Sequence, residues 1–300
     1  MLNLKSNIPF VNYFRAFNII SLIIILISVG SIFYKGLNFG VDFKGGTLIE
    51  LRVDNKEISI SEIREAFIKM NLGDVNVKRF GKEGDYLIKF EETESNNKNL
   101  VENIKDKLFK NLEINFNFRR VENVGPKVSG ELLRAGLIAI SLSLAAMLFY
   151  IWIRFEWQFS LGAIIALVHD VIITIGFFSI LEFEINLSIV AAVLTIVGYS
   201  MNDTVVIFDR VRENLKKYTS KKIDEISNIS INETLSRTII TSLTTLLALL
   251  SIFFFGGTIL HGFSFAMILG VIFGTYSSIF IANPILIKLK VSQKSVLNED

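Results

Sequence analysis

The chain has 300 residues, a mean hydropathy of +0.50 and a hydrophobic fraction of 51%, with 26 Phe. A soluble domain of this size could not easily bury so much apolar surface, so the composition indicates a membrane protein. The net charge of +2 does not suggest nucleic acid as a partner, and with no cysteine and two histidines we expect neither disulfides nor a metal site or other cofactor.

Six segments are long and apolar enough to cross a bilayer, which takes roughly 20 residues at about 1.5 Å rise each. They lie at 16–34, 135–153, 159–181, 186–208, 236–257 and 262–287. The first resembles a secretory signal peptide in outline, because Lys5 and Arg15 precede it. It is longer than a typical signal core and no small-residue cleavage site follows, so we interpret it as a retained anchor helix.

Between the first two segments, residues 36–131 have the composition of a soluble domain. Apolar residues alternate as in strands over 46–53, 74–80, 85–91 and 114–122, with the hairpin signal "GKEG" at 81–84, and recur at helical spacing over 59–71 and 99–112. The order β-α-β-β-α-β is the ferredoxin-like pattern, which names no ligand and also suits a plain folded spacer. The predicted fold is a polytopic α-helical membrane protein, with six transmembrane helices and one exported α+β domain between helices 1 and 2.

Lys and Arg in the short loops predict the orientation, because cytoplasmic loops carry an excess of them. They follow the second, fourth and sixth segments: Arg154, Arg210, Arg212, Lys216, Lys217, Lys221, Lys222, Lys288, Lys290 and Lys294. Both termini are therefore predicted to be cytoplasmic. The predicted parts are the N-terminal segment with helix 1 (1–35), an extracytoplasmic domain (36–131), helices 2–6 (132–290) with a basic cytoplasmic loop (209–235), and a cytoplasmic tail (291–300).

Nucleotide-binding and hydrolase motifs are missing from the sequence. The stretch "GPKVSGEL" at 125–132 has the glycine spacing of a phosphate-binding loop, but Glu131 and Leu132 stand where Lys and Ser or Thr are needed. Neither H-E-x-x-H nor G-x-S-x-G occurs. We therefore predict no enzyme activity and place the chemistry in the membrane segments.

Three ionisable residues lie within or at the edge of those segments: Asp170, Asp203 and Arg237. Such residues are rare in lipid and indicate a functional site with a partner. Segments four and five run antiparallel, so Asp203 and Arg237 fall at similar depth and can pair if the two helices are adjacent. Hydroxyl residues surround Arg237 in "SRTIITSLTT" (236–245). A carboxylate between desolvation and a guanidinium can take up and release protons, which predicts a relay.

Structural roles stay open for each of these residues. Arg237 lies near the end of its segment, where a long side chain can snorkel to the interface. Asp203 lies too deep for that, but both it and Asp170 can hydrogen-bond between helices. His169 is interpreted as a packing neighbour of Asp170. Four charged residues are interpreted as a cluster at the membrane edge: Asp209, Arg210, Arg212 and Glu213.

Five stretches of the sequence resemble one family in their order along the chain. "GLNFGVDFKGGTLIEL" (36–51) resembles the G-x-D-F-x-G-G signature of the SecD/SecF proteins, and "VGPKVSGEL" (124–132) resembles the matching return element. "ALVHDV" (166–171), "GYSMNDTVVIFDRVREN" (198–214) and "SRTIITSLTT" (236–245) resemble the membrane motifs of the SecF branch. The length, the single small exported domain and the H-D and N-D forms favour this branch over SecD.

The resemblance implies a function that composition does not show. Proteins of this family belong to the RND superfamily and lie in the bacterial plasma (inner) membrane. They work with SecD beside the SecYEG channel, with YajC as a further partner, and help to move preproteins outward using the proton or sodium gradient. By resemblance the relay residues are Asp203 and Arg237, with Asp170 as a third candidate. The signature residues are expected to be structural: Gly40, Asp42, Gly45 and Gly46.

Two other functions fit parts of the pattern. Half of an RND-type exporter of small molecules or lipids would have a large exported domain, whereas this one is small. An intramembrane aspartyl protease also has two Asp on neighbouring spans, but it needs Y-D and G-x-G-D contexts, and here Asp170 and Asp203 lie in "VHDV" and "MNDT". The opposing Arg237 also disfavours two carboxylates that share one proton. Copurification of SecD and SecYEG, or cleavage of a substrate, would discriminate.

Overall fold

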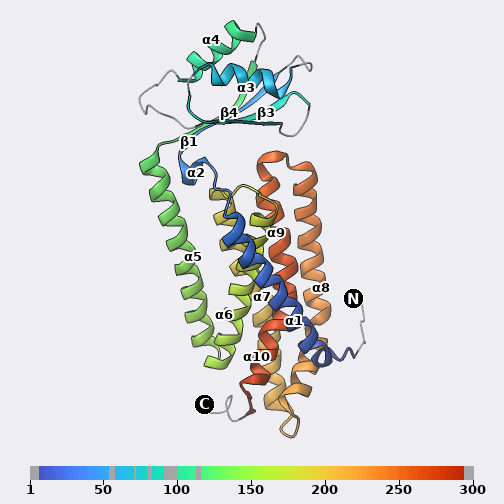
Figure 1. The fold of residues 1–300 in the computed structure, drawn as a ribbon. Coiled ribbons are helices and arrows are strands. Elements are labelled where there is room, and N and C mark those ends of the chain that lie inside the picture. Colours follow the sequence, from blue (N-terminus) through green and yellow to red (C-terminus); the bar gives the residue numbers. More distant parts are fainter. Residues whose placement is uncertain are drawn as a thin grey trace. The chain divides into compact units, whose positions relative to one another are not determined.

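The computed structural model describes residues 7–53, 58–70, 72–79, 83–90, 100–112 and 116–293. The chain divides into two compact units, which can be followed in Figure 1. The helical unit comprises Met1–Asn38 and Ile138–Asp300, and the α+β unit comprises Phe39–Leu137.

Within the described ranges, six helices are long and apolar enough to cross a membrane, which confirms the predicted polytopic fold. They are α1 (Phe10–Lys35), α5 (Pro126–Arg154), α6 (Trp157–Ile180), α7 (Leu187–Lys217), α8 (Ile223–Phe255) and a sixth that begins with α9 (Thr258–Ser277). A π-helical turn, η1 (Ser278–Ala282), and a short helix, α10 (Asn283–Lys288), continue the sixth. The chain is a multi-pass membrane protein.

The loop predicted at 209–235 is mostly helical, which corrects that part of the sequence analysis. Helix α7 continues to Lys217 and α8 already begins at Ile223. Charged side chains of this stretch link the two helices, because Arg210 of α7 donates to Glu233 of α8 at 2.6 Å. Charged residues with good helix propensity can extend a helix beyond the hydrocarbon region, and hydropathy alone does not detect that extension.

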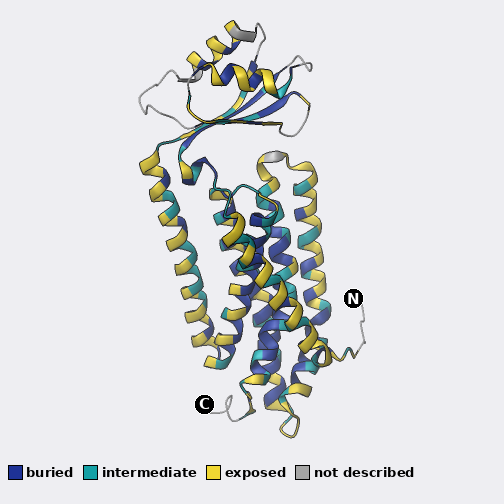
Figure 2. Ribbon diagram, in the orientation of Figure 1, coloured by how far each residue is buried: buried dark blue, intermediate teal, exposed yellow. Residues whose placement is uncertain are grey.

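Three helices form the centre of the helical unit and three surround them. In the most apolar window of α6, α7 and the sixth helix, 56%, 50% and 61% of the residues are buried, against 11%, 11% and 17% in α1, α5 and α8. Figure 2 shows the same contrast between dark blue central helices and yellow outer ones. The outward-facing side chains of the outer helices are nevertheless apolar, as expected for contact with lipid.

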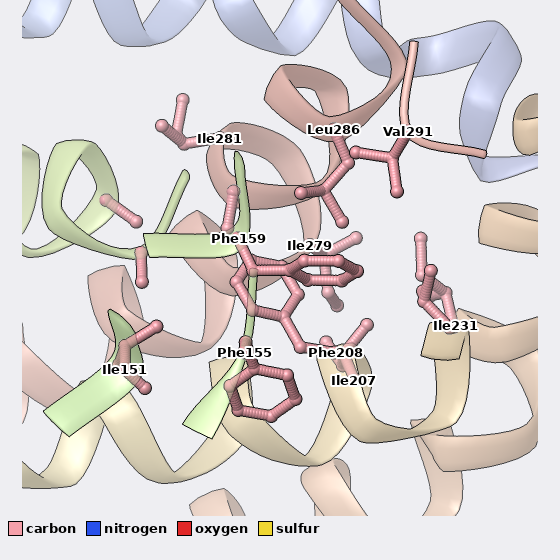
Figure 3. Close-up of a cluster of buried hydrophobic side chains, with 14 of the residues drawn as sticks. Ile151, Phe155, Phe159, Ile207, Phe208, Ile231, Ile279, Ile281, Leu286 and Val291 are labelled. Atoms are coloured by element: carbon pink, nitrogen blue, oxygen red, sulfur yellow. The ribbon is translucent and has the colours of Figure 1, made fainter. Parts of the chain in front are cut away.

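A cluster of buried apolar side chains joins α5, α6, α7, α8 and the end of the sixth helix (Figure 3). Phe159 packs edge-on against Phe208, with ring centroids 5.1 Å apart, and Phe155 stacks on Phe159 at 5.6 Å. Ile279 of η1 and Leu286 of α10 belong to the same cluster. This packing fixes the position of α10 against α6 and α7.

The α+β unit has the predicted β-α-β-β-α-β order. Its elements are β1 (Gly46–Val53), α3 (Ile60–Ile68), β2 (Val75–Arg79), β3 (Asp85–Phe90), α4 (Leu100–Leu112) and β4 (Phe116–Val124), preceded by the short helix α2 (Val41–Lys44). The strands form one antiparallel sheet in the order β2-β3-β1-β4. Residues 81 and 82 of the predicted "GKEG" hairpin lie outside the described residues. So do residues at the ends of five predicted elements and most of the predicted tail: 71, 80, 91, 99, 114–115 and 294–300.

The two faces of this sheet differ in chemistry. One face packs Ile49 and Ile88 against Phe67 of α3 and Leu108 of α4, all fully buried. The other carries charged pairs, such as the bidentate contact of Arg52 with Asp85 at 2.6 Å. Successive side chains of a strand point to opposite faces, so the sheet has an apolar core side and a polar surface side, as the alternation in the sequence predicted.

Candidate ion-relay site

Asp203 lies where three helices of the helical unit meet. It is on α7, is 3% exposed, and its Oδ2 accepts hydrogen bonds from Ser242 of α8 at 3.4 Å and Thr275 of α9 at 3.3 Å. The hydroxyls of Ser242 and Thr275 are themselves 2.6 Å apart. The carboxylate is therefore buried, and both of these contacts are long and weak.

Two glycines allow α9 to approach α7 this closely. A Cβ added at Gly274 would lie 2.9 Å from the Cβ of Ser200, and one added at Gly270 would lie 2.2 Å from Cγ1 of Ile196. Real Cβ atoms do not approach so closely, and small residues are typical of tight helix pairs in membranes. The pair of glycines brings the α9 hydroxyls within reach of the α7 carboxylate.

Asp170, on α6, lies in a second polar cluster that is more tightly bonded. It is 0% exposed, its Oδ2 accepts from Ser200 of α7 at 2.6 Å and from Ser277 of α9 at 2.8 Å, and its Oδ1 is 2.8 Å from Nδ1 of His169. The three short contacts satisfy much of the hydrogen-bonding capacity of a carboxylate. Asp170 therefore joins α6, α7 and α9, which is the helix-to-helix role left open by the sequence.

The two clusters are neighbours, because they use the same pair of helices. Ser200 and Asp203 are about one turn apart on α7, and Thr275 and Ser277 are two residues apart on α9. Any movement of α9 along or around its axis would alter the contacts of both carboxylates. The contacts of Thr275 and Ser277 with the two carboxylates were not predicted from the sequence. The polar run "TYSS" in an apolar segment is a signal that could have indicated them.

Arg237 does not form a direct ion pair with Asp203 in the part of the chain that the structure describes. Helices α7 and α8 are adjacent, as expected, and Tyr199 donates to the carbonyl of Thr241 between them at 3.3 Å. The Arg237 side chain is exposed on α8, whereas the Asp203 carboxylate is buried on α7. The geometry agrees with a partner at a distance and also with a snorkelling side chain.

His169 has more contacts than sequence reasoning gave it. Besides its contact with Asp170, its ring stacks on Tyr276 of α9, with centroids 6.0 Å apart. Its Nε2 is buried without a hydrogen-bond partner among the described residues. The same ranges contain no group of three or more His, Cys, Asp or Glu side chains suited to a metal ion.

The glycine signature lies in the α+β unit, where it forms a turn. Gly40 precedes α2, Asp42 lies in its first turn, and Gly45, just before β1, and Gly46, the first residue of β1, have φ of 79° and 113°. Residues with side chains rarely adopt such angles. A Cβ at Gly45 would also lie 3.2 Å from the carbonyl oxygen of Val124. The two glycines therefore let the chain turn sharply beside β4.

Known proteins similar to this chain share one description. The family model described as "Protein export membrane protein SecD/SecF, C-terminal" matches residues 104–292, and the model "SecD/SecF GG Motif" matches residues 30–57. "Protein translocase subunit SecF" of Rickettsia bellii (strain OSU 85-389) is 49% identical over 283 residues, which cover 94% of this chain and 93% of the relative. Its counterpart in Rickettsia prowazekii (strain Madrid E) is 48% identical over 285 residues, covering 94% and 91%.

Two solved structures have the same fold. The crystal structure of SecDF, described as a translocon-associated membrane protein from Thermus thermophilus, superposes with a TM-score of 0.87 at 33% identity. SecDF in a super-membrane-facing form superposes with a TM-score of 0.71 at the same identity. In both cases 97% of this chain is covered, but the chain spans 40% of the SecDF chain.

Proposed function

This chain belongs to the SecD/SecF family of protein export membrane proteins, and we propose that it acts as the SecF-type accessory subunit of the Sec protein translocase. Support comes from relatives named as SecF subunits, because their similarity extends over 94% of this chain rather than over one motif. No feature of the site favours the small-molecule exporter or the aspartyl protease.

The expected partner is SecD. The SecDF structures support this pairing, because the chain matches 40% of a longer protein that bears both names. We propose SecYEG, YajC and translocating preproteins as further partners, with membrane lipid around the outer helices. The proposed setting is the bacterial inner membrane, with both termini cytoplasmic and residues 36–131 exported. The Lys and Arg asymmetry of the short loops supports this orientation.

Asp203 is the proposed coupling group, with Arg237 as its electrostatic partner. The observation that carries this assignment is a buried carboxylate held by two long hydroxyl contacts of 3.3 and 3.4 Å. One charge moving through 100 mV releases about 2.3 kcal/mol. Two hydrogen bonds at roughly 0.5–1.5 kcal/mol each contribute about 1–3 kcal/mol together, so the two energies are of the same size. An ion or proton can therefore exchange at Asp203 without breaking the bundle.

Asp170 is the proposed second acid of the relay. Its three contacts of 2.6–2.8 Å make it the fixed member, which holds α6, α7 and α9 together while Asp203 exchanges. Whether the exchanged ion is a proton or sodium is decided by experiment, because a carboxylate among hydroxyls can bind either.

The test is export of a radiolabelled preprotein into inverted membrane vesicles that contain SecYEG, SecD and the full chain. Asp203→Asn keeps the shape of the side chain but removes the titrating group, so the increase in export caused by a proton or sodium gradient should disappear. Arg237→Lys keeps the charge but loses the planar guanidinium and should weaken the response. The control is Asp209→Asn on the same helix, in an exposed ion pair with Arg154, which should export normally. Wild-type gradient dependence in Asp203→Asn would refute the relay.

A further inference from the structure

The sixth membrane helix contains a π-helical turn, η1, directly after the residues that contact the two carboxylates. A proline explains it. Pro284 has no N–H to donate to the carbonyl of Phe280, four residues earlier, and its ring collides with that carbonyl in a regular α-helix. Inserting one residue into the turn relieves the collision, and such π turns are frequent at functional sites.

Helix α1 supplies the donor that the proline removes. Nδ2 of Asn18 donates to the carbonyl of Phe280 at 3.0 Å and to that of Phe14, in its own helix, at 2.6 Å. In a membrane no water satisfies such a carbonyl, and a backbone group left without a partner is costly. Asn18 therefore stabilises the π turn from outside the helix that contains it.

The C-terminal end of the turn is held as well. Asn283 is fully buried, its Nδ2 donates to the carbonyl of Ser278 at 2.8 Å, and its Oδ1 accepts from Ser227 of α8 at 3.2 Å. Leu286 then packs in the apolar cluster of Figure 3 together with Ile279 and Ile281 of η1. The segment after the turn is thus fixed against α6, α7 and α8.

The segment before the turn carries the contacts to the relay. Thr275 donates to Asp203, and Ser277 donates to Asp170. Between them, the hydroxyl of Tyr276 donates to the carbonyl of Phe17 in α1 at 2.7 Å. Helix α1 therefore contacts the sixth helix both just before the π turn and within it, through residues 17 and 18.

The extra residue of the π turn sets the direction in which these hydroxyls point. Each residue of an α-helix turns the chain by about 100° and advances it by about 1.5 Å. If α10 stays fixed and the π turn becomes a regular α-helical turn, Thr275 and Ser277 would rotate by about 100° about the helix axis. Both hydroxyls would then point away from the carboxylates. Their hydrogen bonds would be lost, because hydrogen bonds weaken steeply with misalignment.

We propose that Pro284 and Asn18 are positioning residues for the relay: the proline creates the π turn, and the asparagine of α1 stabilises it in the register that aims Thr275 and Ser277 at the two carboxylates. This inference rests on the proposed function of Asp203. It also makes α1, which leads in sequence to the α+β unit, part of the coupling machinery.

The test compares two single variants with their combination, in full-length chain with SecD and SecYEG in inverted vesicles. Pro284→Ala restores an N–H for the carbonyl of Phe280, so the chain should accumulate to within twofold of wild type. Its gradient-stimulated export should fall at least tenfold, because the hydroxyls are misdirected. Asn18→Leu removes the side-chain donor to that carbonyl, so accumulation itself should fall at least threefold.

The double variant separates positioning from simple stability. In Asn18→Leu with Pro284→Ala, the restored N–H makes the asparagine unnecessary, so accumulation should return to within twofold of wild type while export stays low. A merely structural role would restore export as well, and that result would overturn the proposal. Matched controls are Asn12→Leu, also on α1, and Pro126→Ala, at the first residue of α5, where a proline costs no hydrogen bond. Both should export normally.

Other results are equally decisive. The inference would be overturned if Pro284→Ala kept normal gradient dependence or failed to accumulate. It would also be overturned if the double variant showed no recovery of accumulation. Asp203→Asn is measured alongside. If it retains the gradient response, the proposed relay itself is refuted. If it loses the response while Pro284→Ala keeps it, the failure belongs to the positioning role alone.

Discussion

Replacing Asp170 by leucine should destabilise the helical unit, because it removes one acceptor that serves three donors. The hydroxyls of Ser200 and Ser277 have a second choice, since such side chains can turn to a carbonyl of their own helix, and Ser277 already lies 3.2 Å from the carbonyl oxygen of Gly274. His169 has none. Its Nε2 is already unpartnered among the described residues, and Nδ1 would lose Asp170.

The size of the effect follows from this difference between the two serine hydroxyls and the imidazole of His169. A buried donor left without a partner costs about 1–3 kcal/mol, and the two hydroxyls lose less than the imidazole does. We expect a loss of about 3 kcal/mol in the free energy of unfolding, offset only partly by relief of burying a carboxylate. In thermal unfolding in detergent this corresponds to a midpoint lower by roughly 5–10 °C.

A second substitution provides the refuting result. His169→Leu in the Asp170→Leu background removes the stranded imidazole, so at least half of the lost stability should return, as found when a whole buried polar pair is replaced by apolar residues. Thr174→Val is the control, because in the part of the chain that the structure describes this hydroxyl bonds only within its own helix, to the carbonyl of Asp170 at 2.8 Å. A wild-type midpoint for Asp170→Leu, or no recovery in the double variant, would show that the cluster does not hold the helices together.

Two further predictions concern the α+β unit. Gly45→Ala forces a side chain into a φ of 79° and should cost about 1–2 kcal/mol, seen as faster proteolysis of this unit, whereas Gly30→Ala, with open space around it, should be neutral. Backbone and hydroxyl hydrogen bonds from Ser59 hold the pKa of Glu62 below its ordinary value. Because a depressed pKa stabilises the fold above the unfolded pKa, the protection of the amides at the start of α3, measured as exchange relative to their intrinsic rates, should fall as the pH falls below about 4. Glu62→Gln, which keeps the capping contacts, should lose that pH dependence, and an unchanged profile would contradict the role of the carboxylate.

Local patterns in the sequence were enough to predict the helices and strands of this protein. Twenty or so apolar residues in a row leave few choices other than a membrane helix, so six spans could be located by composition alone. Period-two alternation and apolar residues at helical spacing likewise specified the strands and helices of the α+β unit. The rarity of charge in lipid singled out Asp170 and Asp203 before any contact was known.

Which of these residues contact one another depends on how the helices pack. Nothing local in the sequence says that Ser277 contacts Asp170, 107 positions away, or that Asn18 reaches the carbonyl of Phe280, 262 positions away. Those contacts depend on which helices are adjacent and on how each is rotated, and hydropathy is nearly blind to rotation when lipid and protein are both apolar. The missing ion pair between Asp203 and Arg237 has the same cause: equal depth can be counted along the chain, but the direction in which a side chain points is set by packing.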